Sequence, residues 1–245
     1  MKIGGLRRRT QRLAAIYQEV GIVAVMTKIS QRLLRVAGTD SRSHASWLHH
    51  KAIIDAAFDR ERGTDTGGID EIFDLSVVGG NSQHGFSHIA TSPDEFHRMM
   101  LDLKLTHHLD QYTFIDLGCG KGRALLLAAQ YPFAKIIGVE FAKEFLSAAE
   151  ANIRKAISSP KIRAKIELVL ADAATYEFPA GHLLVYLFNP FDSIIVRHVA
   201  RNARAARLSQ ERSLLVVYMN PQHLDEFSKE GWKVAHSQNG WAQLR

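Results

Sequence analysis

The sequence is poor in cysteine, in proline and in long apolar runs. Its 245 residues include one cysteine, Cys119, and six prolines. A single cysteine excludes an intramolecular disulfide framework and a zinc site built from several cysteines. It is typical of a reducing compartment, so we expect a cytoplasmic protein. The most apolar stretch, residues 13–29, is interrupted by Gln18, Glu19 and Lys28. It is therefore too short to be read as a transmembrane helix.

Acidic residues are scarce in one region only. Residues 1–50 hold nine Lys and Arg but two acids, whereas residues 51–245 hold 22 basic and 23 acidic residues. The net charge of +6 therefore describes an N-terminal arm, and a basic nucleic-acid-binding face on the rest of the chain is not implied. The arm is interpreted either as a solvated start of the chain or as a contact for an anionic membrane surface or RNA. Its strongest cluster is Arg7, Arg8, Arg9 and Arg12.

Helical patterns dominate the first 60 residues. Apolar residues recur at helical spacing over residues 10–36, and a second helical pattern covers residues 47–60. The glycine-rich run 63–68 then predicts a loop, and the glycines within 79–85 indicate irregular structure. We therefore predict a basic helical segment at residues 1–60 and one domain at residues 61–245.

From Ser92 onward the chain alternates between strand and helix patterns. Ser92, Pro93 and Glu95 are typical of a helix start with a capping box, and this helix should run to about His108. Apolar runs predict strands at residues 112–117, 135–140, 166–170, 182–188, 213–219, 232–236 and 241–244. Amphipathic patterns predict helices at residues 121–130, 142–157, 192–208 and 221–230.

Near-continuous apolar strands separated by amphipathic helices indicate a parallel sheet that is covered on both faces. Right-handed crossovers then predict a doubly wound, mostly parallel α/β sheet. Asn239 and Gly240 lie between the last two strands and are typical of a hairpin turn. We therefore expect an antiparallel strand at or near one edge of the sheet.

The densest functional signal is the glycine-rich turn that follows the first of these strands, residues 116–123 (DLGCGKGR). Glycines let the backbone turn tightly and approach a ligand closely. A phosphate-binding loop is excluded because Lys121 is followed by Gly122 rather than Ser or Thr. A dinucleotide fingerprint fits poorly because its third glycine is displaced. Asp116 would repel a pyrophosphate but would suit an ammonium group.

Two more acids follow the next two strands. Glu140 ends the second strand, where a carboxylate can accept hydrogen bonds from ribose hydroxyls. Asp172 follows the third strand, where it can accept from the exocyclic amine of adenine. Together with Asp116 these acids describe a ligand that carries an ammonium, a ribose and an adenine. S-adenosylmethionine fits that description and requires no phosphate site.

The four segments FIDLGCGKG, GVE, ADA and FNPF together resemble the class I S-adenosylmethionine-dependent methyltransferase family. The resemblance covers residues 90–245. It implies a seven-stranded sheet, with the last two strands in reversed order, and S-adenosylmethionine as cofactor. It implies these cofactor-binding residues: Asp116, Gly118, Cys119, Gly120, Gly122, Glu140, Phe141, Asp172, Ala173 and Asn189.

The segment after the fourth strand, Asn189-Pro190-Phe191, resembles a shortened form of the [DN]-P-P-[YF] motif of amino-group methyltransferases. The resemblance implies that these three residues are catalytic and that the acceptor is a nitrogen, with protein lysine as one class. A small-molecule acceptor stays open. The alternative is a simple turn, because Asn220-Pro221 ends the next strand in the same way. Two other functions stay open: a cofactor-binding adaptor without turnover, and a nicotinamide-dependent oxidoreductase.

Other polar clusters carry weaker signals. His84 and His88 are four residues apart, but Gly85 lies between them and a third ligand is lacking, so we predict no metal site. One face of the helix 192–208 carries a row of arginines. This row is interpreted as a solvated face or as a surface for an acidic partner. Its members are Arg197, Arg201, Arg204 and Arg207.

Overall fold

The structure, a computed structural model, describes residues 41–70, 75–79, 81, 84–85, 88–103, 108–208, 213–238 and 240–245. Its internal contacts divide the chain into two compact units, Met1–Lys51 and Ala52–Arg245. The helices expected within residues 10–36 lie outside the described residues. The predicted division into a basic helical segment at residues 1–60 and a domain at residues 61–245 stays a prediction. None of the described helices is long and apolar enough to cross a membrane.

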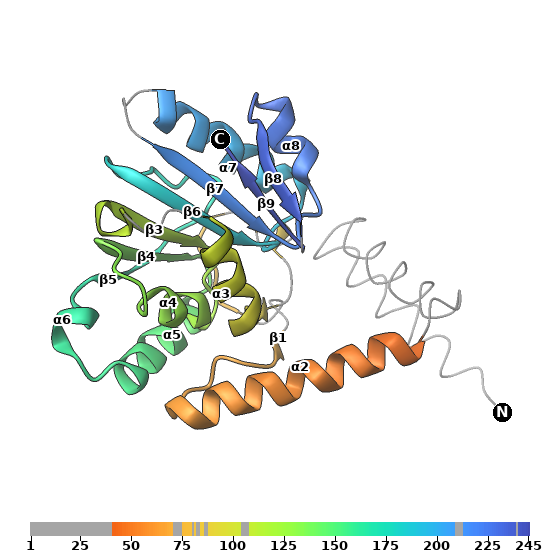
Figure 1. The fold of residues 1–245 in the computed structure, drawn as a ribbon, viewed down its shortest axis with the longest axis vertical. Coiled ribbons are helices and arrows are strands. Elements are labelled where there is room, and N and C mark those ends of the chain that lie inside the picture. Colours follow the sequence, from red (N-terminus) through yellow and green to blue (C-terminus); the bar gives the residue numbers. More distant parts are fainter. Residues whose placement is uncertain are drawn as a thin grey trace. The chain divides into compact units, whose positions relative to one another are not determined.

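A seven-stranded sheet forms the centre of the second unit, in the order β5-β4-β3-β6-β7-β9-β8 (Figure 1). All seven strands lie within two residues of the predicted ranges, and β8 differs most, by two residues at each end. The bounds are β3 (Tyr112–Leu117), β4 (Lys135–Glu140), β5 (Ile166–Leu170), β6 (His182–Phe188), β7 (Leu214–Met219), β8 (Val234–Gln238) and β9 (Trp241–Leu244). A separate two-stranded sheet pairs β1 (Ile69–Asp70) with β2 (His88–Ile89).

Strand direction in the large sheet follows the expected pattern. The pairs from β5 through β7 are all parallel. The last strand, β9, lies between β7 and β8 and is antiparallel to both. The prediction of a mostly parallel doubly wound sheet, with a C-terminal antiparallel strand and the last two strands in reversed order, is therefore confirmed.

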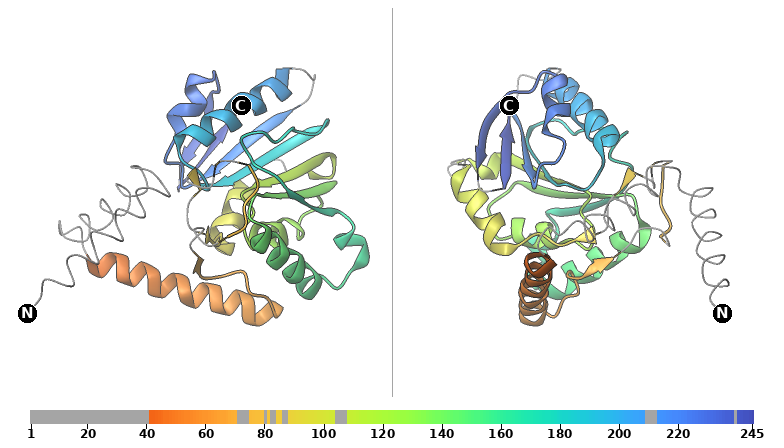
Figure 2. Two further views of the ribbon diagram at one scale, coloured as in Figure 1. Left: turned by 180° about the vertical axis from the view of Figure 1, so that it is seen from behind. Right: turned by 90° about the vertical axis from the view of Figure 1, so that its right-hand side faces the viewer.

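Helices cover both faces of this sheet, as Figures 1 and 2 show. One face carries α3 (Pro93–Asp102), α4 (Arg123–Ala128) and α5 (Lys143–Ala156), and the other carries α7 (Ser193–Leu208) and α8 (Leu224–Lys229). Two further helices are α2 (Ser41–Arg62) and the short α6 (Pro160–Arg163). Successive residues of β3 serve the two faces in turn, since Phe114 belongs to one buried cluster and Ile115 to the other.

The start of α3 was predicted correctly, but its end was not. Pro93 is the first helical residue and Ser92 is the N-cap. The predicted capping box does not form, because Ser92 makes no side-chain capping hydrogen bond. The helix ends at Asp102 rather than near His108, and its cap residue Leu103 donates its backbone N–H to the Met99 carbonyl.

The arginine row on α7 binds the segment that starts with α8 rather than facing solvent alone. Arg197 donates to Glu226 at 2.6 Å, and one turn later Arg201 donates to Glu230 at 3.2 Å. Arg204 donates to the Gly231 carbonyl at 2.8 Å. The row thus holds α8 and the turn after it against α7, a role that the sequence did not indicate. Arg197 and Arg201 stay 47% and 62% exposed, so this face is solvated as well, and an acidic partner stays a prediction.

Candidate active site

The carboxyl ends of β3 and β6 form the place where the sheet order reverses direction. Strands β4 and β5 extend from β3 on one side, and β7 extends from β6 on the other. Open α/β sheets bind ligands in the crevice at such a switch point. All four predicted motifs follow the strands around it, with the glycine turn after β3, Glu140 ending β4, Asp172 after β5 and Asn189 after β6.

The glycine turn has the left-handed backbone that its sequence requires. Gly118 and Gly120 have φ values of 81° and 51°, a region that other residues adopt only with strain. A Cβ atom on Gly118 would lie 2.7 Å from Pro190 Cβ, and one on Gly120 would lie 2.3 Å from His88 Nδ1. The turn is therefore closely packed between the segment after β6 and the segment that contains β2.

Glu140 is held by the backbone around the turn. Its Oε2 accepts from Gly120 N–H at 2.8 Å. Its Oε1 accepts from Phe141 N–H and from Ala142 N–H, at 2.9 and 3.0 Å. Burial raises the pKa of this carboxyl, and the three backbone donors oppose that shift. Glu140 thus fixes the glycine turn to the end of β4.

Asp116 lies in an acidic and buried environment. Burial raises its pKa well above the usual range, and the nearby Glu140 carboxyl raises it further. The same two carboxyls, after burial itself, raise the pKa of the Cys119 thiol. Cys119 is therefore a protonated, buried small residue rather than a nucleophile. A cationic group on a ligand would relieve the repulsion between the two acids.

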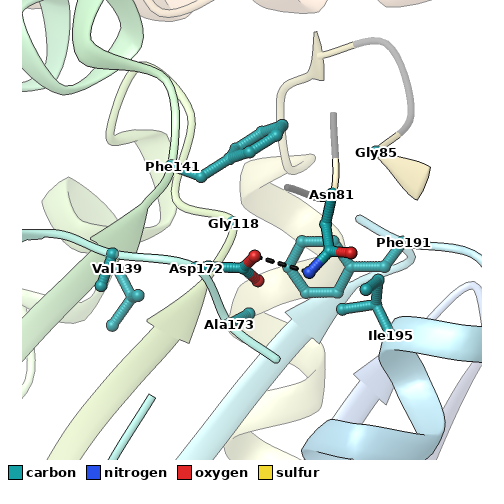
Figure 3. A pocket seen from close by; sticks show the side chains of 10 residues that line it. Asn81, Gly85, Gly118, Val139, Phe141, Asp172, Ala173, Phe191 and Ile195 are labelled. Atoms are coloured by element: carbon teal, nitrogen blue, oxygen red, sulfur yellow. Dashed lines mark hydrogen bonds between the residues drawn. The ribbon is translucent and has the colours of Figure 1, made fainter. Parts of the chain in front are cut away.

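A pocket opens beside these acids, and Figure 3 shows its side chains. Asp172 and Asn81 point toward each other, and Asn81 Nδ2 donates to Asp172 Oδ2 at 2.6 Å. Oδ1 of Asp172 accepts from Ala174 N–H at 2.9 Å. Phe141 lies on one side of this pair and Phe191 on another (Figure 3). The pocket thus combines apolar walls with a carboxylate.

The predicted site residues are divided by this pocket into two groups. Those that line it are Gly118, Phe141, Asp172, Ala173 and Phe191. Those that do not line it are Asp116, Cys119, Gly120, Gly122, Glu140, Asn189 and Pro190. The second group belongs to the glycine turn and to the strand ends next to it. The assignment of each residue to the cofactor or the acceptor stays a prediction.

The sequence did not indicate that a segment before α3 contributes to the pocket. Residues 76–78 run antiparallel to the chain after β4, where Val78 N–H donates to the Phe141 carbonyl at 2.9 Å. Farther along, Gly85 forms a β-bridge with Phe191. Asn81 and Gly85 both line the pocket. The glycines of this segment were the available signal, since a Cβ on Gly79 would lie 2.3 Å from Asp172 Oδ2.

A second feature that the sequence did not indicate is a buried arginine just after the glycine turn. Arg123 is 1% exposed and donates to Asp55 Oδ1 at 2.6 Å and to Thr66 Oγ1 at 2.6 Å. The neighbouring Lys121 pairs with Asp70 at 2.7 Å. These contacts connect the helix α4 and the turn to the second half of α2 and to the loop after it.

Metal binding finds no support among the described residues, which contain no cluster of three or more suitable side chains. The two histidines at helical spacing bind other groups. His84 Nδ1 lies 2.6 Å from Asp192 Oδ2, and His88 Nε2 lies 3.0 Å from the Thr66 carbonyl.

The comparison with protein families favours the methyltransferase among the functions left open by the sequence. Residues 108–216 match the family model described as a methyltransferase domain, and this range contains all of the predicted site residues. The sheet has the strand order that the resemblance implies. The match and the strand order support the resemblance to the class I S-adenosylmethionine-dependent methyltransferases. This family implies S-adenosylmethionine as the cofactor, and the buried Asp116 and Glu140 fit the ammonium and ribose of that molecule.

Solved structures similar to this methyltransferase domain are remote in sequence. One is the StiE O-MT, at 17% identity and a TM-score of 0.44, where the match covers 59% of this chain and 53% of the other. The methyltransferase domain of bacterial CtHen1 has 15% identity, a TM-score of 0.47 and coverages of 62% and 97%. The glycopeptide N-methyltransferase MtfA complexed with S-adenosylmethionine has 12% identity, a TM-score of 0.48 and coverages of 63% and 93%. No curated protein sequence matches the chain significantly.

Proposed function

We propose that this methyltransferase transfers its methyl group to a nitrogen, and that a lysine amine of a protein is the first acceptor class to test. The observation that carries the proposal is the position of the segment Asn189-Pro190-Phe191. Pro190 packs against Gly118 of the glycine turn, and Phe191 lines the pocket. An amide oxygen and an aromatic ring beside the methionine end of the cofactor suit an amine acceptor.

The residues around the site supply binding and orientation. Asp116 provides the negative charge for the ammonium of the cofactor, and Glu140 and Asp172 provide hydrogen-bond acceptors for its sugar and base. When bound, S-adenosylmethionine supplies an electrophilic methyl group on a sulfonium. A nitrogen acceptor must be neutral to attack, so the protein has to hold its lone pair toward that methyl group. Most of the rate enhancement then comes from positioning.

The basic N-terminal arm supports a second, separate part of the proposal. Residues 1–50 carry nine of the 31 Lys and Arg residues and two of the 25 acids. We infer that this arm brings the enzyme to an anionic surface or to an acidic region of its acceptor. Electrostatic attraction of this kind raises association rates and weakens with salt.

The test is transfer of labelled methyl groups from S-adenosylmethionine to fractionated cell extract, followed by acid hydrolysis and amino-acid analysis. The proposal expects label in methylated lysine, and no label with the Gly120→Val variant. Label in an O-methyl or carbon-bound product would overturn the nitrogen acceptor but keep the methyltransferase. Binding of cofactor without any labelled product would favour the adaptor function. Hydride transfer from a nicotinamide dinucleotide would favour the oxidoreductase.

A further inference from the structure

Two asparagines end consecutive strands with the same local backbone. Asn189 follows β6 and Asn220 follows β7, and a proline comes after each of them. Both residues have left-handed backbones, with φ values of 42° and 47°. Asn220 can therefore be compared with Asn189 to test whether Asn189 only forms a turn. If both asparagines only make turns, their side chains should be placed alike.

The side chains are placed differently. Oδ1 of Asn220, an exposed residue, accepts from Gln222 Nε2 two residues further along the chain, at 3.0 Å. Oδ1 of Asn189 instead accepts from the hydroxyl of Tyr218 on the neighbouring strand, also at 3.0 Å. Tyr218 is fully buried. The carboxamide of Asn189 is therefore held by the neighbouring strand, whereas that of Asn220 makes a local contact.

The chemistry of Tyr218 decides which end of the carboxamide it binds. Its pKa is raised to about 12 by burial, against hydrogen bonds from the backbone at His223 and Gln222. The phenol therefore keeps its proton near neutral pH and can donate it to Asn189 Oδ1, which lies 3.0 Å away. The atom of Asn189 that faces this donor is its oxygen, which accepts the hydrogen bond, and this contact sets the orientation of the amide.

The strand order places Asn189 on the acceptor side of the cofactor. Asp172 lies just after β5, Glu140 ends β4 and Asp116 lies on β3. These three strands are consecutive neighbours in the sheet. They are assigned to adenine, ribose and ammonium in that spatial order. The next strand is β6, so Asn189 lies beyond the methionine end. Pro190 lies against Gly118, which brings this end of β6 to the glycine turn.

We propose that Tyr218 is a positioning residue that locks the carboxamide of Asn189 so that its oxygen accepts a hydrogen bond from the amine that receives the methyl group. The oxygen of an amide has two lone pairs, and one is used by Tyr218. Because the amide cannot rotate freely, the second lone pair is held in one direction. This inference rests on the proposed function and adds a residue and a specificity to it.

The test uses sinefungin, an analogue in which a carbon bearing an amino group replaces the sulfonium and its methyl group. That amine probes the acceptor side without knowledge of the acceptor. Calorimetry measures its Kd relative to that of S-adenosylhomocysteine, which lacks the group. Tyr218→Phe and Asn189→Gly should each lower the preference for sinefungin by about three- to tenfold, the size expected for one hydrogen bond to a charged or polar group. Glycine suits the left-handed backbone, so Asn220→Gly is the matched control and should leave the preference unchanged.

Each outcome decides between two ideas. An unchanged preference in Tyr218→Phe, with normal binding of S-adenosylhomocysteine, overturns the positioning role and leaves the methyltransferase intact. An equal loss in Asn220→Gly also overturns it, because a general effect of the turns would explain the result. Failure of the wild-type chain to bind either compound overturns the proposed function itself. Thermal melting of the variants checks that the fold is retained.

Discussion

The guanidinium of Arg123 lies 4.4 Å from the centre of the Phe58 ring. The same group pairs with Asp55 at 2.6 Å and with Asp59 at 3.3 Å. A cation, an aromatic face and two carboxylates thus join the second half of α2 to the helix that follows the glycine turn. These contacts connect the segment just after the glycine turn to residues that lie 64 to 68 positions earlier in the chain.

Replacement of Arg123 tests the strength of this connection. Arg123→Met leaves Asp55 and Asp59 without their cation in a buried place, so the free energy of unfolding should fall by about 3–5 kcal/mol. Urea unfolding measures it. Arg154→Met removes an exposed ion pair with Glu150 and should cost at most about 0.5 kcal/mol. Equal effects of the two substitutions would contradict a structural role for the buried cluster.

The glycine turn offers a second, geometric test. Gly120→Val places side-chain atoms in the space where a Cβ already meets His88 Nδ1 at 2.3 Å, and we expect it to abolish cofactor binding. Gly240→Val is the control, because Gly240 also has a positive φ of 81° but has no atom within 4 Å of an added Cβ. Both variants carry backbone strain, but only Gly120→Val adds a steric clash. Normal affinity for S-adenosylhomocysteine in a folded Gly120→Val protein would contradict the site.

The buried acids predict how stability depends on pH. Burial, with a smaller contribution from Glu140, raises the pKa of Asp116 above the ordinary 3.8. The folded state therefore holds this proton more tightly than the unfolded state. Without ligand, stability should fall as pH rises from the unfolded pKa upward through the raised folded pKa.

Asp116→Asn removes that titration, so its stability should fall less over the same range, and a smaller slope from Glu140 should remain. Urea unfolding at several pH values makes the comparison. Asp110→Asn changes an exposed carboxyl and should follow the wild type. A slope in Asp116→Asn equal to that of the wild type would rule out Asp116 as its source.

The fold was predictable because its strong signals are local. Each strand of the large sheet is a short apolar run, and the parallel arrangement follows from burial on both faces. The ends of α3 and α8 were less accurate, since the expected helix 221–230 begins only at Leu224. The ends of short helices are the part of a sequence-based assignment that is least well defined.

The acids of the site were predictable for a related reason. Asp116, Glu140 and Asp172 follow apolar strands directly, and the carboxyl ends of parallel strands meet at one edge. The pair of Asn81 and Asp172 was not predictable, because these residues are 91 positions apart. The glycines around Asn81 indicated only irregular structure.

The arginine row on α7 has acidic partners that the sequence also contains at a matching spacing. Arg197 and Arg201 are four residues apart, and so are Glu226 and Glu230. Matching spacings of opposite charge, on α7 and at the end of α8, indicate that the two segments can pair. The row was interpreted alone, so its partner on α8 was missed.

The N-terminal arm gives a prediction about function rather than folding. A chain that starts near Thr39 should fold and bind S-adenosylmethionine, because the cofactor motifs all lie later in the sequence. It should lose any binding to vesicles that contain anionic lipid, and in the full chain that binding should weaken as salt rises. Co-sedimentation over a salt series measures this. A truncated chain that melts well below the full chain would show that the arm belongs to the fold.

We expect the acids around the glycine turn to bind S-adenosylmethionine. Calorimetric titration of the full chain with S-adenosylhomocysteine, and with the nicotinamide dinucleotides, tests it most directly. The account predicts one site for S-adenosylhomocysteine, no detectable dinucleotide binding, loss of binding in Asp116→Ala, and a cost of about 1–3 kcal/mol in Glu140→Ala. Dinucleotide binding by the wild type, or wild-type affinity for S-adenosylhomocysteine in folded Asp116→Ala, would contradict it.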